Sequence, residues 1–322
     1  MSLRSWSPRA QFRRWWQARL PRSDSWQLGQ RNIYILPTKA GVTFALTLAV
    51  MLLAAINYQL NLGYALTFLL TGAALVSMHI THGNLRGLTL HLRPGAPNHA
   101  GRPAPLEVVI TNPGRERYGL MLMFEDRARH GKASAWCDAS AGGQSRAMLS
   151  FVPQQRGWHE TPTLVLSTVF PLGLFRAWTI WRPAHRVLAW PRPEDPPQAL
   201  PTSASRSGDE PDARRGAGSE LDGVRPWRRG DSMRQVAWKK VARSGELVSR
   251  ETAGTATREL WLDWFETPGT DVEQRLSRLA AWVLLADREG VDVGLRLPQI
   301  TLPMGQGDAH RVAAMGALAQ WV

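Results

Sequence analysis

The stretch AGVTFALTLAVMLLAAINYQLNLGYALTFLLTGAALVSMHITHGNL, residues 40–85, contains no Asp, Glu, Lys or Arg. A helix crosses the hydrocarbon core of a membrane in about 20 residues, so this stretch is too long for one helix and long enough for two. The polar residues of NYQLN (57–61) interrupt it near the middle. The stretch therefore predicts a two-helix transmembrane hairpin within residues 41–80, with helices at about 41–57 and 62–80. A stretch without charge over this length disfavours the alternative of a buried hairpin in a soluble protein.

Positive charge flanks this hairpin on both sides. Residues 1–40 carry a net charge of +7, and Arg86, Arg93 and Arg102 follow the second helix. Basic flanks favour the cytoplasmic side of a membrane, so both termini and the soluble domains are expected in the cytoplasm. Residues 1–40 are predicted to be a basic cytoplasmic tail. Its interleaved tryptophans and arginines favour contact with anionic lipid, and disorder of its first residues is the alternative.

Residues 86–190 contain short apolar runs separated by Pro and Gly, such as APLEVVITNPG (104–114) and TPTLVLSTVFPLGLFRAWTIW (161–181). Runs of this kind at regular spacing predict a β-rich, sandwich-like domain. Residues 191–218 are rich in Pro, Gly, Ser and Asp and have no apolar periodicity. That composition predicts a flexible linker.

Residues 219–322 are predicted to form an α/β domain. A strand ends at Asp263, a second strand is expected in VDVGLRLP (291–298), and ITLPMG (300–305) is a possible short third. An amphipathic helix between the first two has one apolar face, formed by Leu276, Leu279, Ala280 and Val283. A closing helix follows in AHRVAAMGALAQWV (309–322). Strands that alternate with helices indicate a parallel sheet.

The tract RPWRRGDSMRQVAWKKVARSGELVSRE, residues 225–251, mixes basic residues with two tryptophans, as nucleic-acid grooves do. Residues 219–322 nevertheless have a net charge of zero, so no nucleic-acid partner is expected. The pattern fits a helix that begins near Asp231, with Trp238 buried against the sheet, followed by a strand in ELVSRE. Arg228 and Arg229 precede the positive helix end, so they and Arg225 are expected to bind an acidic partner.

Several positions of this tract carry a resemblance to a known family: Arg225, Trp227, Gly230, Asp231, Arg234, Val236, Trp238, Ala242, Arg243 and Glu251. Together with STVFPLGLFRAW (167–178) and the hairpin, they resemble the domain-of-unknown-function 58 family. Its members are bacterial membrane proteins with a divergent von Willebrand factor A-like domain, and they are associated with MoxR-type AAA+ ATPases. The tract departs from the family at Trp227, where Tyr is common, and at Ala237, where His is common.

This resemblance implies a membrane-anchored multidomain protein. Its parts would be a two-helix transmembrane hairpin, a β-sandwich-like domain and a short, truncated von Willebrand factor A-like α/β domain. The implied function is a non-enzymatic scaffold or adaptor that binds a MoxR-type AAA+ ATPase or its client. The family's domain type also implies a possible Mg²⁺ site that begins at Asp263, but Phe265 and Thr267 stand at its hydroxyl positions, and Phe cannot bind a hard cation. We therefore expect no metal and no cofactor.

Two other classes of function are weighed against the scaffold. The first is a membrane-tethered nucleic-acid-binding protein, favoured by the overall charge of +13. The second is a hydrolase or transferase that uses Cys137 or Asp263. Cys137 is the only cysteine, and no His, Asn or Asp at a recognisable spacing supports it as a nucleophile. An enzyme is not expected.

Overall fold

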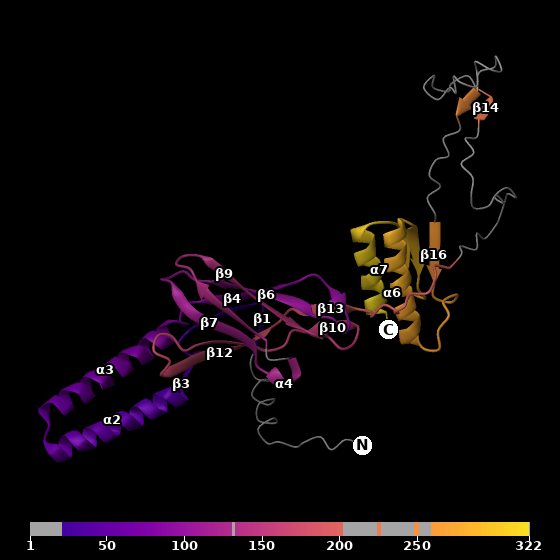
Figure 1. Ribbon diagram of the computed structural model, residues 1–322. Coiled ribbons are helices and arrows are strands. Elements are labelled where there is room, and N and C mark those ends of the chain that lie inside the picture. Colours follow the sequence, from indigo (N-terminus) through magenta and orange to yellow (C-terminus); the bar gives the residue numbers. More distant parts are fainter. Residues whose placement is uncertain (1–20, 131–132, 202–223, 227–247, 251–258, 322) are drawn as a thin grey trace. The chain divides into compact units, whose positions relative to one another are not determined.

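A computed structural model describes residues 21–130, 133–201, 224–226, 248–250 and 259–321 (Figure 1). The chain divides into two compact units. One comprises Met1–Pro193 with Met315–Val322, and the other comprises Glu194–Ala314. The first unit contains the apolar helices and the larger sheets, and the second contains a small α/β sheet.

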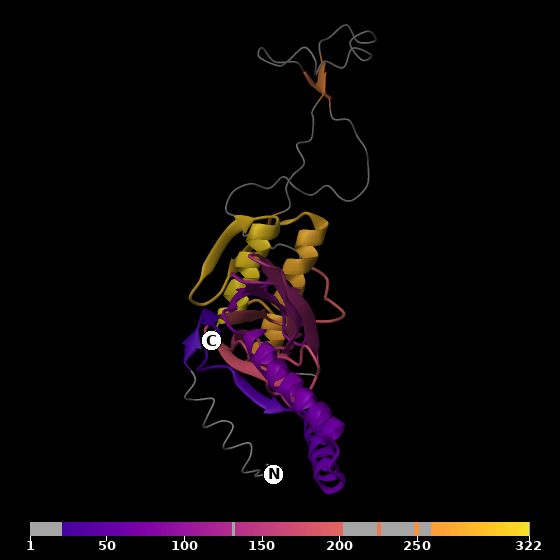
Figure 2. The same ribbon diagram turned by 90° about the vertical axis from the view of Figure 1, so that its left-hand side faces the viewer.

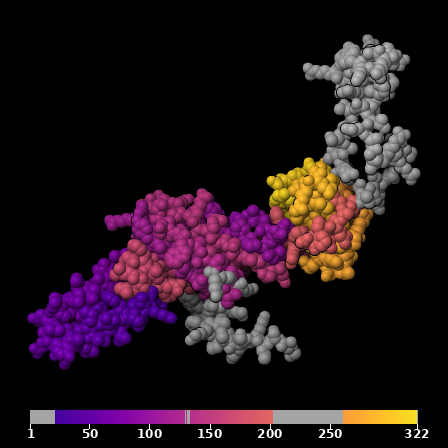
Figure 3. Space-filling view, viewed as in Figure 1, coloured from indigo at the N-terminus to yellow at the C-terminus, as the bar shows by residue number. Residues whose placement is uncertain are grey.

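Two antiparallel helices, α2 (Lys39–Tyr58) and α3 (Asn61–Gly83), are long and apolar enough to cross a membrane. They are joined at Gln59, which adopts a left-handed conformation with φ of 47°. Figures 1 and 2 show both helices extending away from the sheets, and Figure 3 shows the side of the hairpin that faces the viewer uncovered. Leu46 and Leu62 are accordingly 66% and 81% exposed. The prediction of two apolar helices is confirmed, and each helix extends beyond its predicted range.

Two sheets pack face to face in the first unit. One has the order β2-β4-β6-β9, with strands Ser25–Gln27, Thr89–Pro94, Ala104–Thr111 and Gln144–Phe151. The other has the order β1-β12-β11-β7-β8, and β3 also pairs with β12. Its strands are Arg22–Ser23 (β1), Tyr34–Pro37 (β3), Arg117–Phe124 (β7), Ser134–Ala139 (β8), Leu164–Thr168 (β11) and Phe175–Pro183 (β12). Alternate side chains from both sheets, Leu90, Leu106, Leu122, Leu166 and Trp181 among them, form one core.

Smaller elements complete this β-rich unit. A third sheet has the order β10-β13-β5, with strands Gly157–Glu160, Arg186–Trp190 and Asn98–His99. A short helix, α4, spans Arg127–His130 after β7. The prediction of a β-rich region between residues 86 and 190 is confirmed by these strands.

The predicted basic tail is corrected by the structure, because residues 22–37 belong to the sheets. Strands β1, β2 and β3 lie in this segment, and Leu28 and Ile33 are buried in the shared core. Trp26, expected at a lipid surface, packs against the core and donates a hydrogen bond from Nε1 to Thr179 Oγ1 at 3.0 Å. These strands are two to four residues long, so their alternation is too short to recognise among the arginines.

The second unit is built on the strand–helix–strand pattern that the sequence predicts. Strand β16 (Glu259–Asp263) runs parallel to β17 (Asp292–Arg296), and α6 (Val272–Glu289) connects them. The predicted apolar face of α6 is buried. The sheet is mixed rather than parallel, because β18 (Thr301–Gly305) pairs antiparallel with β17. The connection of residues 297–300 is too short for a parallel crossover. Helix α7 (Asp308–Gln320) follows, and the boundary of the unit falls within it, after Ala314.

The first residues of the predicted linker contact α6. Glu194 accepts two hydrogen bonds from the buried Arg278, each at 2.9 Å, and these bonds lower the pKa of the Glu194 carboxyl. The carbonyl oxygens of Gln198 and Ala199 accept hydrogen bonds from Trp282 Nε1 at 3.2 and 3.1 Å. Residues 194–199 are therefore part of the α/β unit, while residues 202–218 of the predicted linker lie outside the described residues.

Candidate functional site

The basic tract predicted to bind a partner lies largely outside the described residues. Its ends form a two-stranded sheet in which β14 (Val224–Pro226) pairs antiparallel with β15 (Val248–Arg250), and Arg225 opposes Ser249. The strand predicted in ELVSRE is thus present. The other predicted positions lie outside the described residues: Trp227, Arg228, Arg229, Gly230, Asp231, Arg234, Trp238, Arg243 and Glu251. Their roles stay predictions.

Asp263, the candidate metal position, ends strand β16 and is used in a turn. Its Oδ1 accepts a hydrogen bond from the backbone N of Phe265 at 2.9 Å. The Phe265 side chain is 78% exposed and offers no ligand atom. Thr267 is buried, and its hydroxyl donates to the backbone oxygen of Asp263 at 2.6 Å. The residues around Asp263 therefore do not fit the Mg²⁺ site that the family resemblance implies. Among the described residues, no group of three or more His, Cys, Asp and Glu side chains could hold a metal ion.

Cys137 lies on β8 with its side chain against the core of the first unit. Burial and, to a smaller extent, the neighbouring Asp138 carboxylate raise the pKa of its thiol to about 11. The reactive form of cysteine is the thiolate, which is scarce at neutral pH when the pKa is this high. This environment is that of a structural cysteine rather than a nucleophile.

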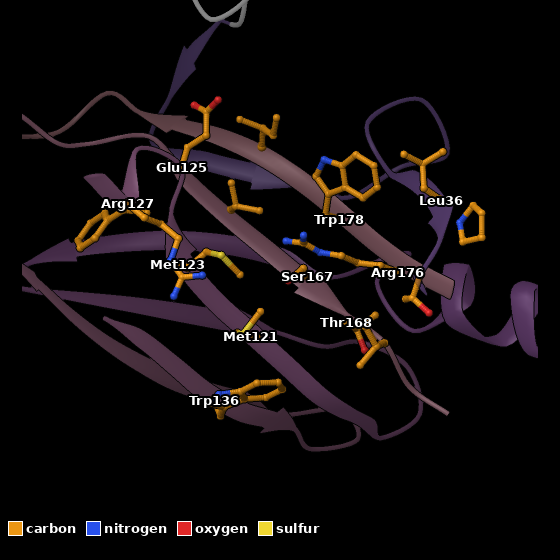
Figure 4. A pocket seen from close by; sticks show the side chains of 16 residues that line it. Leu36, Met121, Met123, Glu125, Arg127, Trp136, Ser167, Thr168, Arg176 and Trp178 are labelled. Atoms are coloured by element: carbon orange, nitrogen blue, oxygen red, sulfur yellow. The ribbon is translucent and has the colours of Figure 1, made fainter. Parts of the chain in front are cut away.

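A groove of about 760 Å³ lies on the outer face of the sheet formed by β3, β12, β11, β7 and β8 (Figure 4). We call it the outer groove. It includes Leu36, Pro37 and Thr38, which directly precede helix α2. A volume in this range is typical of ligand sites, which span roughly 300–1,000 Å³. The remaining lining residues are Met121, Met123, Phe124, Glu125, Arg127, Trp136, Val165, Ser167, Thr168, Val169, Arg176, Trp178 and Ile180.

Strand register arranges the floor of the outer groove in two cross-strand rows. One row crosses all five strands through Tyr34, Trp178, Ser167, Met121 and Trp136. The other crosses the three central strands through Ile180, Val165 and Met123, which are buried and form a small cluster of their own. Apolar side chains thus cover a face of the sheet that points away from the main core. Such a face is unusual in a sheet that meets water on one side.

Arg176 is the charged residue nearest the helix end of the outer groove. It opposes Leu36 in the register of β12 and β3, and its guanidinium lies 5.8 Å from the ring centre of Trp178. Its Nε is buried and has no hydrogen-bond partner among the residues that the structure describes. Figure 4 shows its side chain extending between Trp178 and Ser167, with Glu125 and Arg127 toward the opposite end of the groove. A buried donor of this kind is a place where a ligand oxygen gains a hydrogen bond.

The two apolar helices are fixed to this same sheet by the loop between β11 and β12. Thr38 Oγ1 donates to the carbonyl of Gly173 at 2.6 Å, and Thr81 Oγ1 donates to that of Phe170 at 2.8 Å. Asn84 Nδ2 donates to the carbonyl of Tyr118 at 2.8 Å and to Thr168 Oγ1 at 3.0 Å. We call this set of contacts the hairpin junction. Its loop lies within STVFPLGLFRAW, one of the pieces on which the family resemblance rests.

Close packing also fixes the hairpin junction. A Cβ atom at Gly41, in the first turn of α2, would lie 2.0 Å from the carbonyl oxygen of Leu174. Only glycine has room there. The helix pair is thus held to the sheet by hydrogen bonds and a close backbone approach, and the outer groove begins at this point.

Comparison with known proteins adds no identification. No model of a protein family matches the sequence, and no curated protein matches it. The family resemblance stays a prediction.

Interpretation of the sequence missed the outer groove, although a signal was present. GLMLMF (119–124) is apolar at every position after its glycine, so both faces of strand β7 carry apolar side chains. LVLST (164–168) is buried at all five positions. Strands covered on both faces have such continuous apolar runs. A strand that is free on one face alternates instead.

Proposed function

We propose that this chain is a non-enzymatic scaffold or adaptor anchored in a bacterial inner membrane by α2 and α3. The observation that carries the proposal is the hairpin junction. It fixes two helices with exposed apolar side chains to a folded β unit through hydrogen bonds from Thr38, Thr81 and Asn84. A rigid link of this kind holds a soluble surface at a constant distance from the bilayer.

Charge supports a cytoplasmic position for both termini and both soluble units. Arg22 and Arg31 precede the first apolar helix and Lys39 is its first residue, while Arg86 and Arg93 follow the second helix. The turn at Gln59 and Leu60 carries no charge. Basic residues close to the ends of a span favour the cytoplasmic side.

The partner class that we propose is a MoxR-type AAA+ ATPase or its client, on the strength of the family resemblance. The α/β unit is proposed to be a truncated von Willebrand factor A-like domain. Arg225, Arg228 and Arg229 are proposed to bind an acidic surface of the partner, and the basic N-terminal residues are proposed to contact anionic lipid.

Two alternatives have weaker support. A nucleic-acid binder is favoured by the overall charge of +13, but residues 219–322, which contain the basic tract, have a net charge of zero. An enzyme that uses Cys137 is disfavoured by the raised pKa of its thiol. Asp263 is engaged in a turn with Phe265 and Thr267. The scaffold therefore has the better support.

The membrane part of the proposal is tested by fractionation and by reporter fusions at Val322. We expect the full chain in the membrane fraction after carbonate washing, and fluorescence from a reporter that folds only in the cytoplasm. Alkaline phosphatase activity from a fusion at Val322 would contradict the orientation.

The partner part is tested by capture from solubilised membranes, with identification by mass spectrometry. Replacement of both Arg228 and Arg229 with Ala should reduce capture of the ATPase or its client, most strongly at low salt. A control variant, Arg93→Ala with Arg288→Ala, removes two exposed cations elsewhere and should capture normally. Equal capture by both variants would overturn the assigned surface, and loss of DNA binding in the first variant alone would favour the nucleic-acid alternative.

A further inference from the structure

We propose that the outer groove binds an anionic phospholipid from the adjacent membrane leaflet, with the phosphate at Arg176 and part of an acyl chain on the apolar floor. This inference rests on the proposed membrane anchoring and adds a ligand to it.

The floor offers a surface suited to an acyl chain. Met123, Val165 and Ile180 form an apolar cluster, and Met121 and Trp178 pack against it. Methionine side chains are flexible and adapt to the shape of a hydrocarbon chain. Burial of apolar area stabilises a complex by about 25 cal/mol per Å². The apolar area of the groove that a lipid tail can still cover belongs to the exposed Trp136 and to the partly buried Met121 and Trp178.

The position of the groove favours a lipid over other apolar ligands. Leu36, Pro37 and Thr38 line it, and α2 begins at the next residue, Lys39. Leu36, Val169 and Leu172 are exposed around the hairpin junction, and Val169 also lines the groove. Apolar surface therefore continues from the start of the apolar helix into the groove. A lipid tail can follow this surface without crossing water.

Charge specifies an anionic headgroup. Arg176 is the lining cation nearest the helix end of the groove, its side chain extends between Trp178 and Ser167, and its Nε lacks a partner among the described residues. A guanidinium binds phosphate oxygens through parallel N–H donors.

The test is photo-crosslinking on the full-length chain. Trp136 lines the groove on β8 and is 62% exposed, so p-benzoyl-phenylalanine can replace it with one aromatic side chain for another. The matched control places the same probe at Met148, 57% exposed on the outer face of the other sheet. The protein is reconstituted in vesicles of phosphatidylcholine with or without phosphatidylglycerol. We expect a phosphatidylglycerol adduct from position 136 and none from position 148.

A second variant tests the role of the cation. Arg176→Gln should reduce the adduct about ten-fold, because the loss of one charge-assisted hydrogen bond has an effect of this order. Arg93→Gln, on the outer face of the other sheet, should leave the yield unchanged. Val165→Phe fills part of the floor of the groove and should also reduce the yield of the lipid adduct. Arg176→Gln is the variant less prone to misfolding.

Several outcomes overturn the inference. Equal lipid adducts from positions 136 and 148 would mean general contact with vesicles, and an adduct unaffected by Arg176→Gln would remove the headgroup site. In native membranes, an adduct with another protein or with residues 1–20 in place of lipid would assign the groove to that occupant. A chain that is integrated in membranes but gives no lipid adduct contradicts this inference alone. A chain that is absent from membranes contradicts the proposed function.

Discussion

The two sheets of the first unit share a core but present different outer faces. On the β2-β4-β6-β9 sheet, the outward positions of β4 and β9 hold mostly polar residues: Thr89, His91, Arg93, Gln144, Arg146, Met148 and Ser150. On the β12-β11-β7 strands of the other sheet, the outward face carries Ser167 and Arg176, but its centre is apolar: Trp178, Ile180, Val165, Met121 and Met123. Both sheets contribute buried apolar side chains to the shared core. Their outward difference therefore concerns what each face meets, and not how the core is built.

This contrast distinguishes the sheet face that stabilises the core of a β-sandwich from the sheet face that is available for interaction. A sheet needs one apolar face for the core, and its other face is polar when it is free in water. The polar outer face satisfies that rule. The apolar outer face breaks it beside the hairpin junction, where the chain runs into two apolar helices. Its centre is buried, but Leu36, Trp136 and Val169 expose apolar area along the groove, and exposed apolar area of this kind marks an interaction site.

The largest expected effect comes from a comparison of two valines, one in each sheet, that lie on the outer face near the centre of the sheet. Val165 opposes Ile180 and Met123, whereas Val109 opposes His91 and Arg146. Both valines are buried. Val165→Asp places a carboxylate among apolar groups and should destabilise the unit by about 3–5 kcal/mol, as uncompensated buried charges do. Val109→Asp gains an adjacent cation and should cost less than half of that.

Thermal unfolding of the full chain in detergent measures the difference. A destabilisation of 1 kcal/mol lowers the melting temperature of a domain of this size by about 2–4 °C. Equal losses of stability from Val165→Asp and Val109→Asp would contradict the contrast between the faces, because they would show that a carboxylate is equally unfavourable on both.

The second expected effect concerns the junction that joins the apolar face to the helices. Gly41→Ala should destabilise the protein by about 3 kcal/mol, the upper part of the usual range for overpacking, because the clash is with the backbone carbonyl of Leu174. Gly72→Ala is the matched control, since a Cβ there meets nothing within 4 Å. The loss of stability is measured as reduced resistance of the full chain to protease in membranes. A resistant Gly41→Ala protein would show that the hairpin is not tightly held to the sheet.

Much of this fold could be predicted from the sequence, because its signals are local. An uncharged run of 46 residues gives the helix pair, and apolar spacing gives α6. Thr38, which accepts the hydrogen bond of Gly41 N, explains why α2 begins at Lys39, before the predicted start. The strands of residues 22–37 were missed, because their pairing with β4 and β12 is long-range and their own length is too short to show a period.

The candidate site was predicted less well, for a different physical reason. The groove depends on register across five strands, which places Tyr34 of the segment before α2 in one row with Trp136 of β8. No local pattern contains that information. The sequence does contain GLMLMF (119–124), whose side chains are apolar on both faces of the strand. This run predicts that both faces are covered, but it does not identify what covers the outer face.

The third prediction compares the inner and outer sides of β8. The pKa of the Cys137 thiol is raised from 9.0 to about 11, so its thiolate fraction below pH 9 is about 100-fold lower than that of an ordinary thiol. Ser134→Cys in a Cys137→Ala background puts a thiol on the exposed outer side of the same strand. Alkylation at pH 8 should be about 100-fold slower for Cys137 than for this variant. Its rate should rise about ten-fold per pH unit toward pH 11, since the deprotonated form increases by that factor. Equal rates at pH 8 would place Cys137 on the open side of the sheet.

The smallest expected effect lies on the polar outer face and tests whether that face is free in water. Glu107 and Arg146 form an ion pair across β6 and β9, with 3.2 Å between Arg146 Nε and Glu107 Oε1 and an Arg146 side chain that is 67% exposed. A surface pair of this kind contributes about 0–1 kcal/mol, since water solvates the exposed Arg146 while the Glu107 side chain is 22% exposed. A double-mutant cycle with Glu107→Gln and Arg146→Gln should therefore give a coupling below about 1 kcal/mol, which disappears at about 1 M salt because the screening length falls to about 3 Å. A coupling several times larger that persists in salt would mean that another surface covers the polar face. The contrast between the two faces would then reflect two kinds of interface, one apolar and one charged, instead of one interface and one free surface.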